Sequence, residues 1–205
     1  MVTTSDAGAG IGYTGIRVRG SDATRINITI NGIPYNDAES QGTYWVNLPD
    51  VTSSIQSFQL QRGVGTSTNG PGAFGASLNL ETDFMSADAF AEIASSAGSF
   101  NTQKNTFRFS TGLLKNHFVF SGRLSKINSE GYIDRASSNL NGYTFQMAYK
   151  DEKRLLKGVF FGGHEITYQA WYGLDTETLK NERTYNPAGE IYDNQGVISD
   201  YYDYQ

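Results

Sequence analysis

Apolar and polar side chains alternate with a period of two over much of the second half of this chain. Such alternation is typical of β-strands that have one apolar face. The pattern predicts five strands, at residues 89–96, 105–114, 117–127, 143–150 and 156–166. Each is close in length to the roughly 9 to 11 residues of a tilted membrane-spanning strand. Because any antiparallel sheet with one solvated face shows the same alternation, a water-soluble β-sandwich is an open alternative at this point.

The alternation also predicts which side chains share a face. Residues 106–113 place one set outward and leave Arg108, Ser110 and Gly112 inward. The outward sets on three successive strands are Phe107, Phe109, Thr111 and Leu113, then Phe118, Phe120, Gly122 and Leu124, and then Tyr143, Phe145, Met147 and Tyr149. These sets predict a sheet with one aromatic, apolar face.

The links between the predicted strands differ in length. Those at 115–116 and 151–154 are short, those at 128–142 and after 167 are long, and the one at 98–103 is ambiguous. Outer-membrane barrels alternate short periplasmic turns with longer external loops. If the first strand starts on the periplasmic side, every long link falls outside the cell.

The first 83 residues have a different character. Residues 16–19 and 25–30 predict two short strands, and Asn31-Gly32 predicts a turn, because Asn and Gly tolerate positive φ. Residues 49–55 predict one helical turn, 57–61 a third strand and 78–80 a fourth.

Composition favours β structure, with 23 glycines, 13 tyrosines and 12 phenylalanines in 205 residues. The net charge of -5 gives no basic stripe, so no nucleic-acid partner is expected. With no cysteines, the chain has no disulfides or thiolate sites. The N-terminus lacks the charged and apolar segments of a secretory signal, so we expect Met1 not to be the true start of the protein.

Four spaced motifs resemble the plug of TonB-dependent outer-membrane receptors, over about residues 8–83. They are Val18-Arg19-Gly20, the turn Asn31-Gly32-Ile33-Pro34, the strand 55–63 that ends in Arg62-Gly63, and the segment 69–80 with its glycines and Leu78-Asn79-Leu80. Three positions depart from the family pattern. Asn31 replaces the usual turn aspartate, Gln59 the usual strand glutamate, and Asn69-Gly70 the usual Tyr-Gly.

The resemblance implies a mainly β fold: a partial plug domain with a small mixed α+β sheet, then antiparallel strands of an incomplete transmembrane β-barrel. It places the C-terminal part of the plug at 1–83 and the first five or so barrel strands at 84–205, ending in a long extracellular loop. The implied function is energised uptake, across the cell outer membrane, of a scarce solute such as an iron siderophore, cobalamin or glycan. The implied partners are outer-membrane lipid, the transported ligand and the TonB energy-transducing complex, whose binding box is expected outside this chain.

The resemblance also implies roles for individual residues. Arg19 and Arg62, expected on polar strand faces, would pair with carboxylates of the barrel wall. Candidate ligand contacts at the plug apex are Tyr35, Asn36, Asp37, Tyr44 and Trp45. The aromatic, acidic tail offers Tyr168, Trp171 and Tyr172 as external-loop contacts, with an ordinary solvated loop as the alternative. Structural turns are expected at Gly20, Gly32, Pro34, Gly63, Gly70, Gly72 and Gly75.

Other chemistry has little support in the sequence. Two Gly-x-Gly-x-x-Gly segments, at 10–15 and 70–75, run into β-like sequence and not into a helix, so no dinucleotide cofactor is expected. His117 and His164 stand alone without metal-ligand spacing, and no catalytic grouping is present, so we expect neither a metal site nor an enzyme. The alternative function is a soluble extracellular β-sheet protein that binds glycans or builds surface structure.

Overall fold

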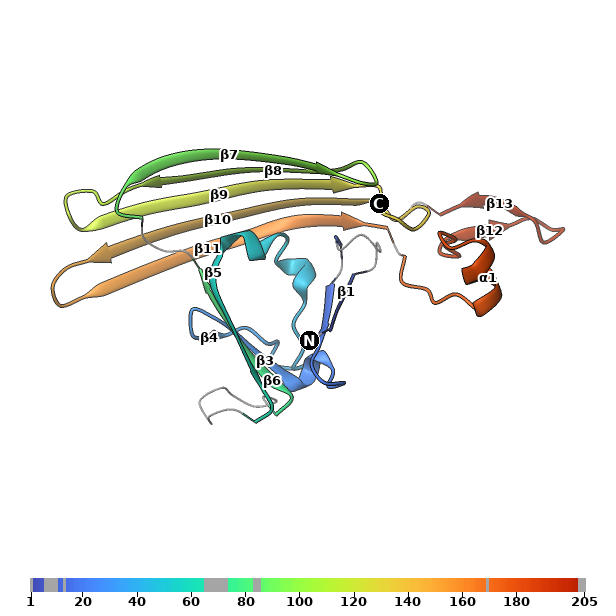
Figure 1. Ribbon diagram of the computed structural model, residues 1–205, viewed down its shortest axis with the longest axis horizontal. Coiled ribbons are helices and arrows are strands. Elements are labelled where there is room, and N and C mark those ends of the chain that lie inside the picture. Colours follow the sequence, from blue (N-terminus) through green and yellow to red (C-terminus); the bar gives the residue numbers. More distant parts are fainter. Residues whose placement is uncertain are drawn as a thin grey trace.

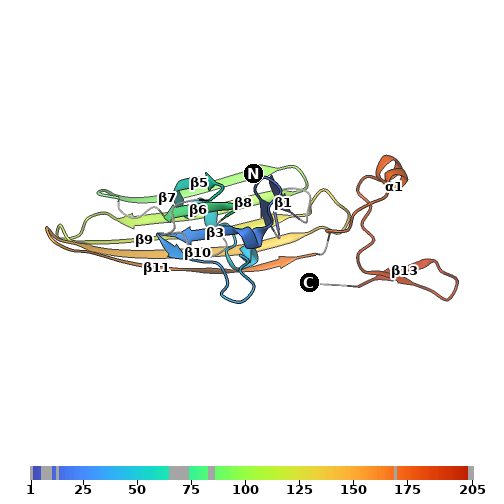
Figure 2. The same ribbon diagram turned by 90° about the horizontal axis from the view of Figure 1, so that it is seen from below.

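The computed structural model describes residues 2–5, 11–12, 14–64, 74–82, 86–168 and 170–202. It is mainly β. A long, curved sheet of five strands lies over a compact unit formed by the first part of the chain (Figures 1 and 2). A small third element, residues 168–202, extends beyond one end of the long sheet. Gly10, Gly70 and Gly72 lie outside the described residues.

The compact unit contains a four-stranded sheet in the order β4-β3-β6-β5. Its strands are β3 (Ile26–Ile30), β4 (Ile33–Pro34), β5 (Ile55–Arg62) and β6 (Ala76–Thr82), and only the β3–β6 pair is parallel. Strands β1 (Val2–Ser5) and β2 (Thr14–Arg17) form a separate antiparallel pair. Three short 3-10 helices, η1 (Ala23–Arg25), η2 (Trp45–Asn47) and η3 (Val51–Ser54), connect these strands. The strands and the helical turn predicted from the sequence are therefore present, with shifted ends.

The core of the compact unit is made by β3 and β6. Its buried members are Val18, Ile26, Ile28, Ile30, Leu48, Ala76, Leu78 and Leu80. The polar residues of β3, Asn27 and Thr29, are buried as well. Thr29 donates a hydrogen bond to Asn79 at 2.7 Å across the parallel pair. The period-two pattern therefore predicts correctly which residues of β3 face the hydrophobic core. It does not predict that the polar residues on the other face are buried too.

Tight turns set the path between these strands. Gly20, Gly32 and Gly63 have φ values of 82°, 80° and 80°, a region that favours glycine. Gly75 serves a different need, because a Cβ atom there would lie 2.6 Å from the carbonyl oxygen of Arg25. Pro34 sits in the edge strand β4, where its missing N–H costs no internal ladder bond.

The long sheet consists of β7 (Ala89–Gly98), β8 (Thr102–Thr111), β9 (Phe118–Ser129), β10 (Ser138–Lys150) and β11 (Leu155–Thr167). Each strand pairs antiparallel with the next, so the order along the sheet follows the sequence. All five predicted strands are confirmed. In this five-stranded sheet β7 and β11 are the edges, so the sheet is open.

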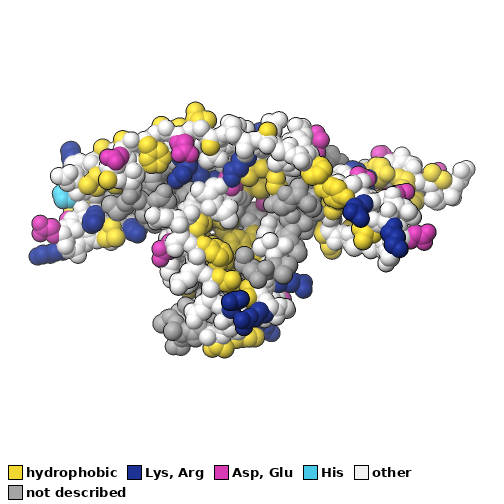
Figure 3. All heavy atoms as spheres, viewed as in Figure 1, with side chains coloured by type: hydrophobic (Ala, Val, Ile, Leu, Met, Phe, Trp, Pro, Cys, Tyr) yellow, Lys and Arg dark blue, Asp and Glu magenta, His cyan; other side chains and the backbone are white. Residues whose placement is uncertain are grey.

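The two faces of the long sheet have the predicted polarity. Phe107, Phe118 and Phe120 are exposed on the outer face, whereas Val119, Arg123 and Thr144 are buried against the compact unit. In a water-soluble sandwich the phenylalanine rows would instead form the core. Figure 3 shows charged side chains gathered at the end of the sheet formed by the β8–β9 and β10–β11 turns.

The predicted contrast in link length is only partly correct. The links 112–117 and 151–154 lie at one end of the sheet, and 99–101 and 130–137 lie at the other (Figure 1). The link predicted at 128–142 is shorter because β10 begins at Ser138, and the ambiguous link is only three residues long. The long connection at this end is therefore residues 168–202.

Residues 168–202 fold into a small helix and a hairpin, whereas the sequence predicted only a loop. They contain α1 (Thr176–Asn181), β12 (Glu190–Tyr192) and β13 (Ile198–Tyr201). Asp175 caps α1, because its carboxylate accepts hydrogen bonds from the amides of Glu177 and Thr178 at 2.9 and 3.0 Å. Among the described residues no helix is long and apolar enough to span a bilayer.

We predict that the 205-residue chain aggregates when it is produced alone in aqueous buffer. It would expose the apolar outer face and the unpaired edges of β7 and β11, which are templates for aggregation. Size-exclusion chromatography with and without detergent checks this expectation. A monomeric peak in plain buffer that melts cooperatively would contradict it.

Candidate functional site: the contact between the compact unit and the sheet

The segment that includes η2 and η3 packs directly on the inner face of the long sheet (Figure 1). At its centre the Asp50 carboxylate accepts hydrogen bonds from Arg123 of β9 at 2.6 Å and from Lys104 of β8 at 2.7 Å. The side chains of Asp50 and Arg123 are only 3% and 4% exposed. This is a buried ion pair between two parts of the chain that are 73 residues apart.

Hydroxyl groups complete the contact around this ion pair. Arg123 donates a second hydrogen bond through Nε to Ser54 at 2.6 Å, and Ser54 donates to Thr144 of β10 at 3.0 Å. Lys104 also donates to Ser53 at 2.6 Å. A buried ion pair is favourable only when additional hydrogen bonds satisfy the charged groups, and these hydroxyls meet that need.

Two glycines of the sheet make room for this segment. A Cβ atom on Gly142 would lie 2.6 Å from the carbonyl oxygen of Pro49, and one on Gly163 would lie 2.3 Å from its ring Cγ. Pro49 is therefore seated in a notch of β10 and β11 that larger side chains would fill. The notch and the ion pair together fix the position of residues 49–54 on the sheet.

A small polar cavity of about 40 Å³ lies beside this contact, between η3 and strands β7–β10. It is lined mainly by hydroxyls together with Arg108, Arg123 and Gln146. The buried Oε1 atom of Gln146 has no hydrogen-bond partner among the described residues. The space suits about two or three water molecules, which would satisfy such an atom.

The surroundings of Asp50 lower its pKa. Burial opposes ionisation of the carboxyl group, but hydrogen bonds from Lys104 and Ser53 and the positive charges of Arg123 and Lys104 outweigh it. Because the folded-state pKa is depressed, ionised Asp50 stabilises the contact fully above its ordinary value of 3.8. That contribution is lost as the pH falls below 3.8 and through the folded-state pKa.

We therefore predict that the contact loosens selectively in acid. Protection of the amides of residues 50–54 from hydrogen exchange, corrected for the intrinsic pH dependence of exchange, should be constant from pH 7 to about pH 4.5 and fall below about pH 3.8. In an Asp50→Asn variant, protection at pH 7 should be lower than in the wild type, and the further fall in acid should be absent. An acid step of the same size in both proteins would contradict the assignment to Asp50.

The five predicted apex residues have different environments in the structure. Tyr35 packs on Phe161 of β11, with ring centroids 6.4 Å apart, and burial raises its pKa. Asn36 holds its own loop, because it accepts from the amide of Ile28 and donates to two carbonyl oxygens. Asp37 accepts hydrogen bonds from the amide and hydroxyl of Ser40, which lower its pKa. Tyr44 is exposed and Trp45 is partly buried against the core. Ligand binding by these five residues stays a prediction.

The two arginines singled out in the sequence lie away from the Asp50 contact. Arg19 was expected on a strand face. It lies instead at the tip of a two-residue turn, with φ of 51°. The turn is closed by paired hydrogen bonds between Val18 and Ser21. Arg62 is the last residue of β5. Both are exposed, and neither forms a salt bridge with another described residue, so their pairing with wall carboxylates stays a prediction.

The three external aromatic residues have different environments. Tyr168 is buried, and its hydroxyl donates to the carbonyl oxygen of Tyr202 at 2.8 Å, which ties residues 168–202 together. Trp171 and Tyr172 are exposed and stacked, with ring centroids 5.0 Å apart. Arg135, in the 130–137 link, anchors the unit further, because it lies over the ring of Tyr201 and donates to the carbonyl oxygens of Asn186 and Ala188.

Sequence comparison identifies the compact unit. Residues 1–77 match the family model of the TonB-dependent receptor plug domain. A comparison with curated protein sequences finds no match.

Structural comparison adds the long sheet. The ferric citrate transporter FecA in its unliganded form aligns with a TM-score of 0.66 and 18% identity, over 92% of this chain and 30% of its own. The pyoverdine receptor FpvA from Pseudomonas aeruginosa PAO1, bound to pyoverdine, aligns with a TM-score of 0.62 and 14% identity, over 91% of this chain and 25% of its own. The copper transporter OprC aligns with a TM-score of 0.62 and 18% identity, over 84% of this chain and 27% of its own.

The fold is thus similar to that of these proteins, and the chain spans about a quarter to a third of their length. Residues 1–77 are similar to the plug domain of TonB-dependent receptors, and the described fold as a whole is similar to that of outer-membrane receptors and transporters.

Proposed function

We propose that this chain is the C-terminal part of the plug, residues 1–83, together with the first five barrel strands and an external loop, residues 84–205, of a transporter that takes up a scarce solute. The observation that most directly supports this proposal is the polar contact centred on Asp50. It holds a separate unit on one face of the sheet while the other face is apolar. A removable plug inside a lipid-embedded wall needs this arrangement.

We further propose that the solute is a chelated metal ion, with an iron siderophore as the first candidate. Support comes from the relatives, whose names specify pyoverdine, ferric citrate and copper. Ligand contacts are expected at Tyr35, Asn36, Asp37, Tyr44 and Trp45 on the plug, and at Trp171 and Tyr172 on the external loop. The TonB energy-transducing complex is the expected partner, and Arg19 and Arg62 would pair with wall strands beyond this chain.

The test is uptake by cells that carry or lack the complete receptor. Cells are given a panel of radiolabelled iron and copper chelates, and accumulation is measured with and without dissipation of the proton gradient. We expect at least one chelate to accumulate only in receptor-bearing, energised cells. Failure of every metal chelate, together with uptake of a metal-free glycan, would overturn the proposed substrate class.

A further inference from the structure

Two tyrosines and a glutamate meet in the external unit formed by residues 168–202. The Tyr185 hydroxyl donates a hydrogen bond to Oε1 of Glu190 at 2.5 Å, and the Tyr192 hydroxyl donates to Oε2 of the same carboxylate. Glu190 raises the pKa of Tyr192, and a hydrogen bond with Tyr185 partly offsets this rise, so the two phenol groups lie side by side. Both phenol oxygens and both carboxylate oxygens therefore converge on one place.

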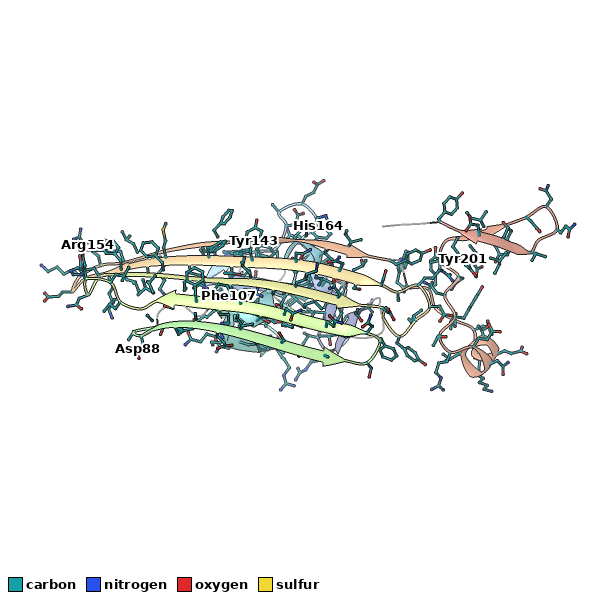
Figure 4. The ribbon with its side chains drawn as sticks, turned by 90° about the horizontal axis from the view of Figure 1, so that it is seen from above. Asp88, Phe107, Tyr143, Arg154, His164 and Tyr201 are labelled. Atoms are coloured by element: carbon teal, nitrogen blue, oxygen red, sulfur yellow. The ribbon has the colours of Figure 1, made fainter. Side chains whose placement is uncertain are left out.

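The β12–β13 hairpin supplies most of this oxygen set. Glu190 and Tyr192 belong to β12, and Tyr201 of β13 is the direct partner of Glu190 across the hairpin. Figure 4 shows Tyr201 in this hairpin, beyond the end of the long sheet and far from Arg154 at its other end. The set is thus separate from the Asp50 contact and from the aromatic residues Trp171 and Tyr172.

Tyr185 comes from the segment between α1 and β12, and its neighbours hold it in place. Asn186 is only 2% exposed and donates a hydrogen bond to the carbonyl oxygen of Asp134 at 3.0 Å. The amide of Asp134 donates to the carbonyl oxygen of Thr184 at 2.7 Å. Residues on both sides of Tyr185 are therefore tied to the 130–137 link, which preorganises the Tyr185 hydroxyl beside Glu190.

The set is open to solvent and offers only oxygen donors. Tyr192 is 56% exposed, so an ion can reach the oxygens without unfolding of the unit. Phenolate and carboxylate are hard anionic donors that suit a small, highly charged cation, and a tyrosine oxygen holds the iron of catalase. In the described part of the chain no group of three or more His, Cys, Asp or Glu side chains could hold a metal ion, so a set of ligands here needs the tyrosines.

A positive charge beside the set favours an anionic carrier for the ion. The guanidinium of Arg135 lies 3.7 Å from the ring centroid of Tyr201, which pairs with Glu190. Two phenolates and one carboxylate balance the charge of a ferric ion but leave octahedral positions open. A small polycarboxylate that is already on the iron would fill these positions, and Arg135 would attract its negative charge.

We propose that Tyr185, Glu190 and Tyr192 coordinate a ferric ion that arrives on a small carboxylate carrier with open coordination positions. On binding, iron–oxygen bonds form to both phenol oxygens and to the carboxylate, both phenol O–H bonds break, and the protons pass to water. The iron stays ferric, so the step needs no oxidant or reductant. The proposal deepens the proposed function and rests on it in one respect, namely that residues 168–202 face the outside of the cell.

The experiment uses the complete receptor, purified in detergent, with ferric nitrilotriacetate as the probe. Phenolate bound to ferric iron absorbs visible light by charge transfer, and resonance Raman spectra excited in this band identify tyrosine as the ligand. We expect the wild type to show the tyrosine signals and to reach full intensity at equimolar iron. A ferric hexadentate trihydroxamate, whose iron has no open position, should give no tyrosine signals.

Variants assign the signals to the proposed ligands. Tyr185→Phe, Tyr192→Phe and Glu190→Gln should each weaken iron binding by about 100-fold or more, because loss of a group that only supports a metal ligand already costs roughly 10- to 100-fold. Tyr132→Phe is the matched control. Its ring packs on Phe100, with centroids 5.6 Å apart, and a phenylalanine keeps that contact, so this variant should bind iron like the wild type.

Two results would overturn the proposal. One is a wild-type receptor whose spectra contain no tyrosine signals, and this outcome does not depend on the folding of any variant. The other is a Tyr185→Phe/Tyr192→Phe double variant with wild-type signals.

Uptake of the chelate panel, measured with the same receptor, separates this site from the proposed function. A receptor that takes up a siderophore but shows no tyrosine–iron signals overturns the iron site alone. A receptor that shows these signals but accumulates no metal chelate overturns the proposed substrate class alone.

Discussion

Replacing Asp50 with alanine is expected to release the plug segment 49–54 from the barrel wall. Removal of one partner leaves the Arg123 guanidinium buried without its counter-charge, and such a loss costs about 3 to 5 kcal/mol. Hydrogen exchange of the 51–62 amides in the complete receptor measures the effect, because exchange reports the free energy of local opening. We expect exchange to be about 100- to 4,000-fold faster in Asp50→Ala than in the wild type, since 1.4 kcal/mol is about a factor of ten.

Two further variants test the origin of this effect. Asp37→Ala removes an exposed plug carboxylate that bonds only to its own loop, so exchange of 51–62 should not change. Asp50→Ala combined with Arg123→Leu should recover part of the lost protection, because the uncompensated buried charge is gone. Wild-type exchange in Asp50→Ala would show that the ion pair does not hold the plug.

Adding one methyl group at Gly142 is expected to push the plug off the sheet. The new Cβ atom would lie 2.6 Å from the carbonyl oxygen of Pro49, and backbone atoms cannot turn aside as a flexible side chain can. Overpacking of this kind costs about 1 to 3 kcal/mol. In the complete receptor, Gly142→Ala should raise the exchange rate of the amides of residues 50–54 by about 5- to 100-fold and should increase entry of a bulky hydrophilic antibiotic.

Gly98→Ala is the matched control for Gly142→Ala. A Cβ atom at Gly98, the last residue of β7, would meet only Thr102 at 3.8 Å, an ordinary contact. That variant should have wild-type exchange and wild-type antibiotic exclusion. Equal behaviour of the two glycine variants would mean that the notch around Pro49 does not position the plug.

The barrel strands could be predicted from the sequence because their two faces meet different environments. Lipid selects apolar outward residues, and the plug and lumen select polar inward ones, so β9 alternates clearly from Phe118 to Ser125. The start of β10 was missed for the same reason. Its first outward residues, Asn139 and Asn141, are polar like the inward Ser138, so the alternation disappears where the strand extends beyond the apolar rows.

The plug–wall contact could not be predicted from local patterns. Asp50 follows Pro49 in a segment that suggests only a helical turn, and its partner Arg123 is one polar residue in a regular strand. Only packing of the two units brings these charges together. The family resemblance pointed to Arg19 and Arg62, but the ion pair in the described residues has the opposite polarity, with the acid on the plug and the cations on the wall.

The folded external unit was missed because its anchors are also distant in sequence. Arg135 contacts Asn186, Ala188 and Tyr201, and Tyr168 contacts Tyr202. A local signal was present, since Asp175 with Thr178 forms a helix N-cap. A helix as short as α1, however, is marginal without tertiary contacts, so the cap alone does not predict it.

Site-directed spin labelling along β9 tests most directly whether this sheet separates lipid from plug. In the complete receptor, single cysteines are introduced one at a time at residues 118–125, a part of the sequence without native cysteines, and the accessibility of each label to oxygen and to a water-soluble nickel complex is measured in bilayers. We predict that labels at Phe118, Phe120 and Leu124 are accessible to oxygen and shielded from nickel, and that labels at Val119, Arg123 and Ser125 are shielded from oxygen. Labels at the phenylalanine positions that are shielded from both reagents, as in a dry protein core, would contradict a lipid-facing barrel wall.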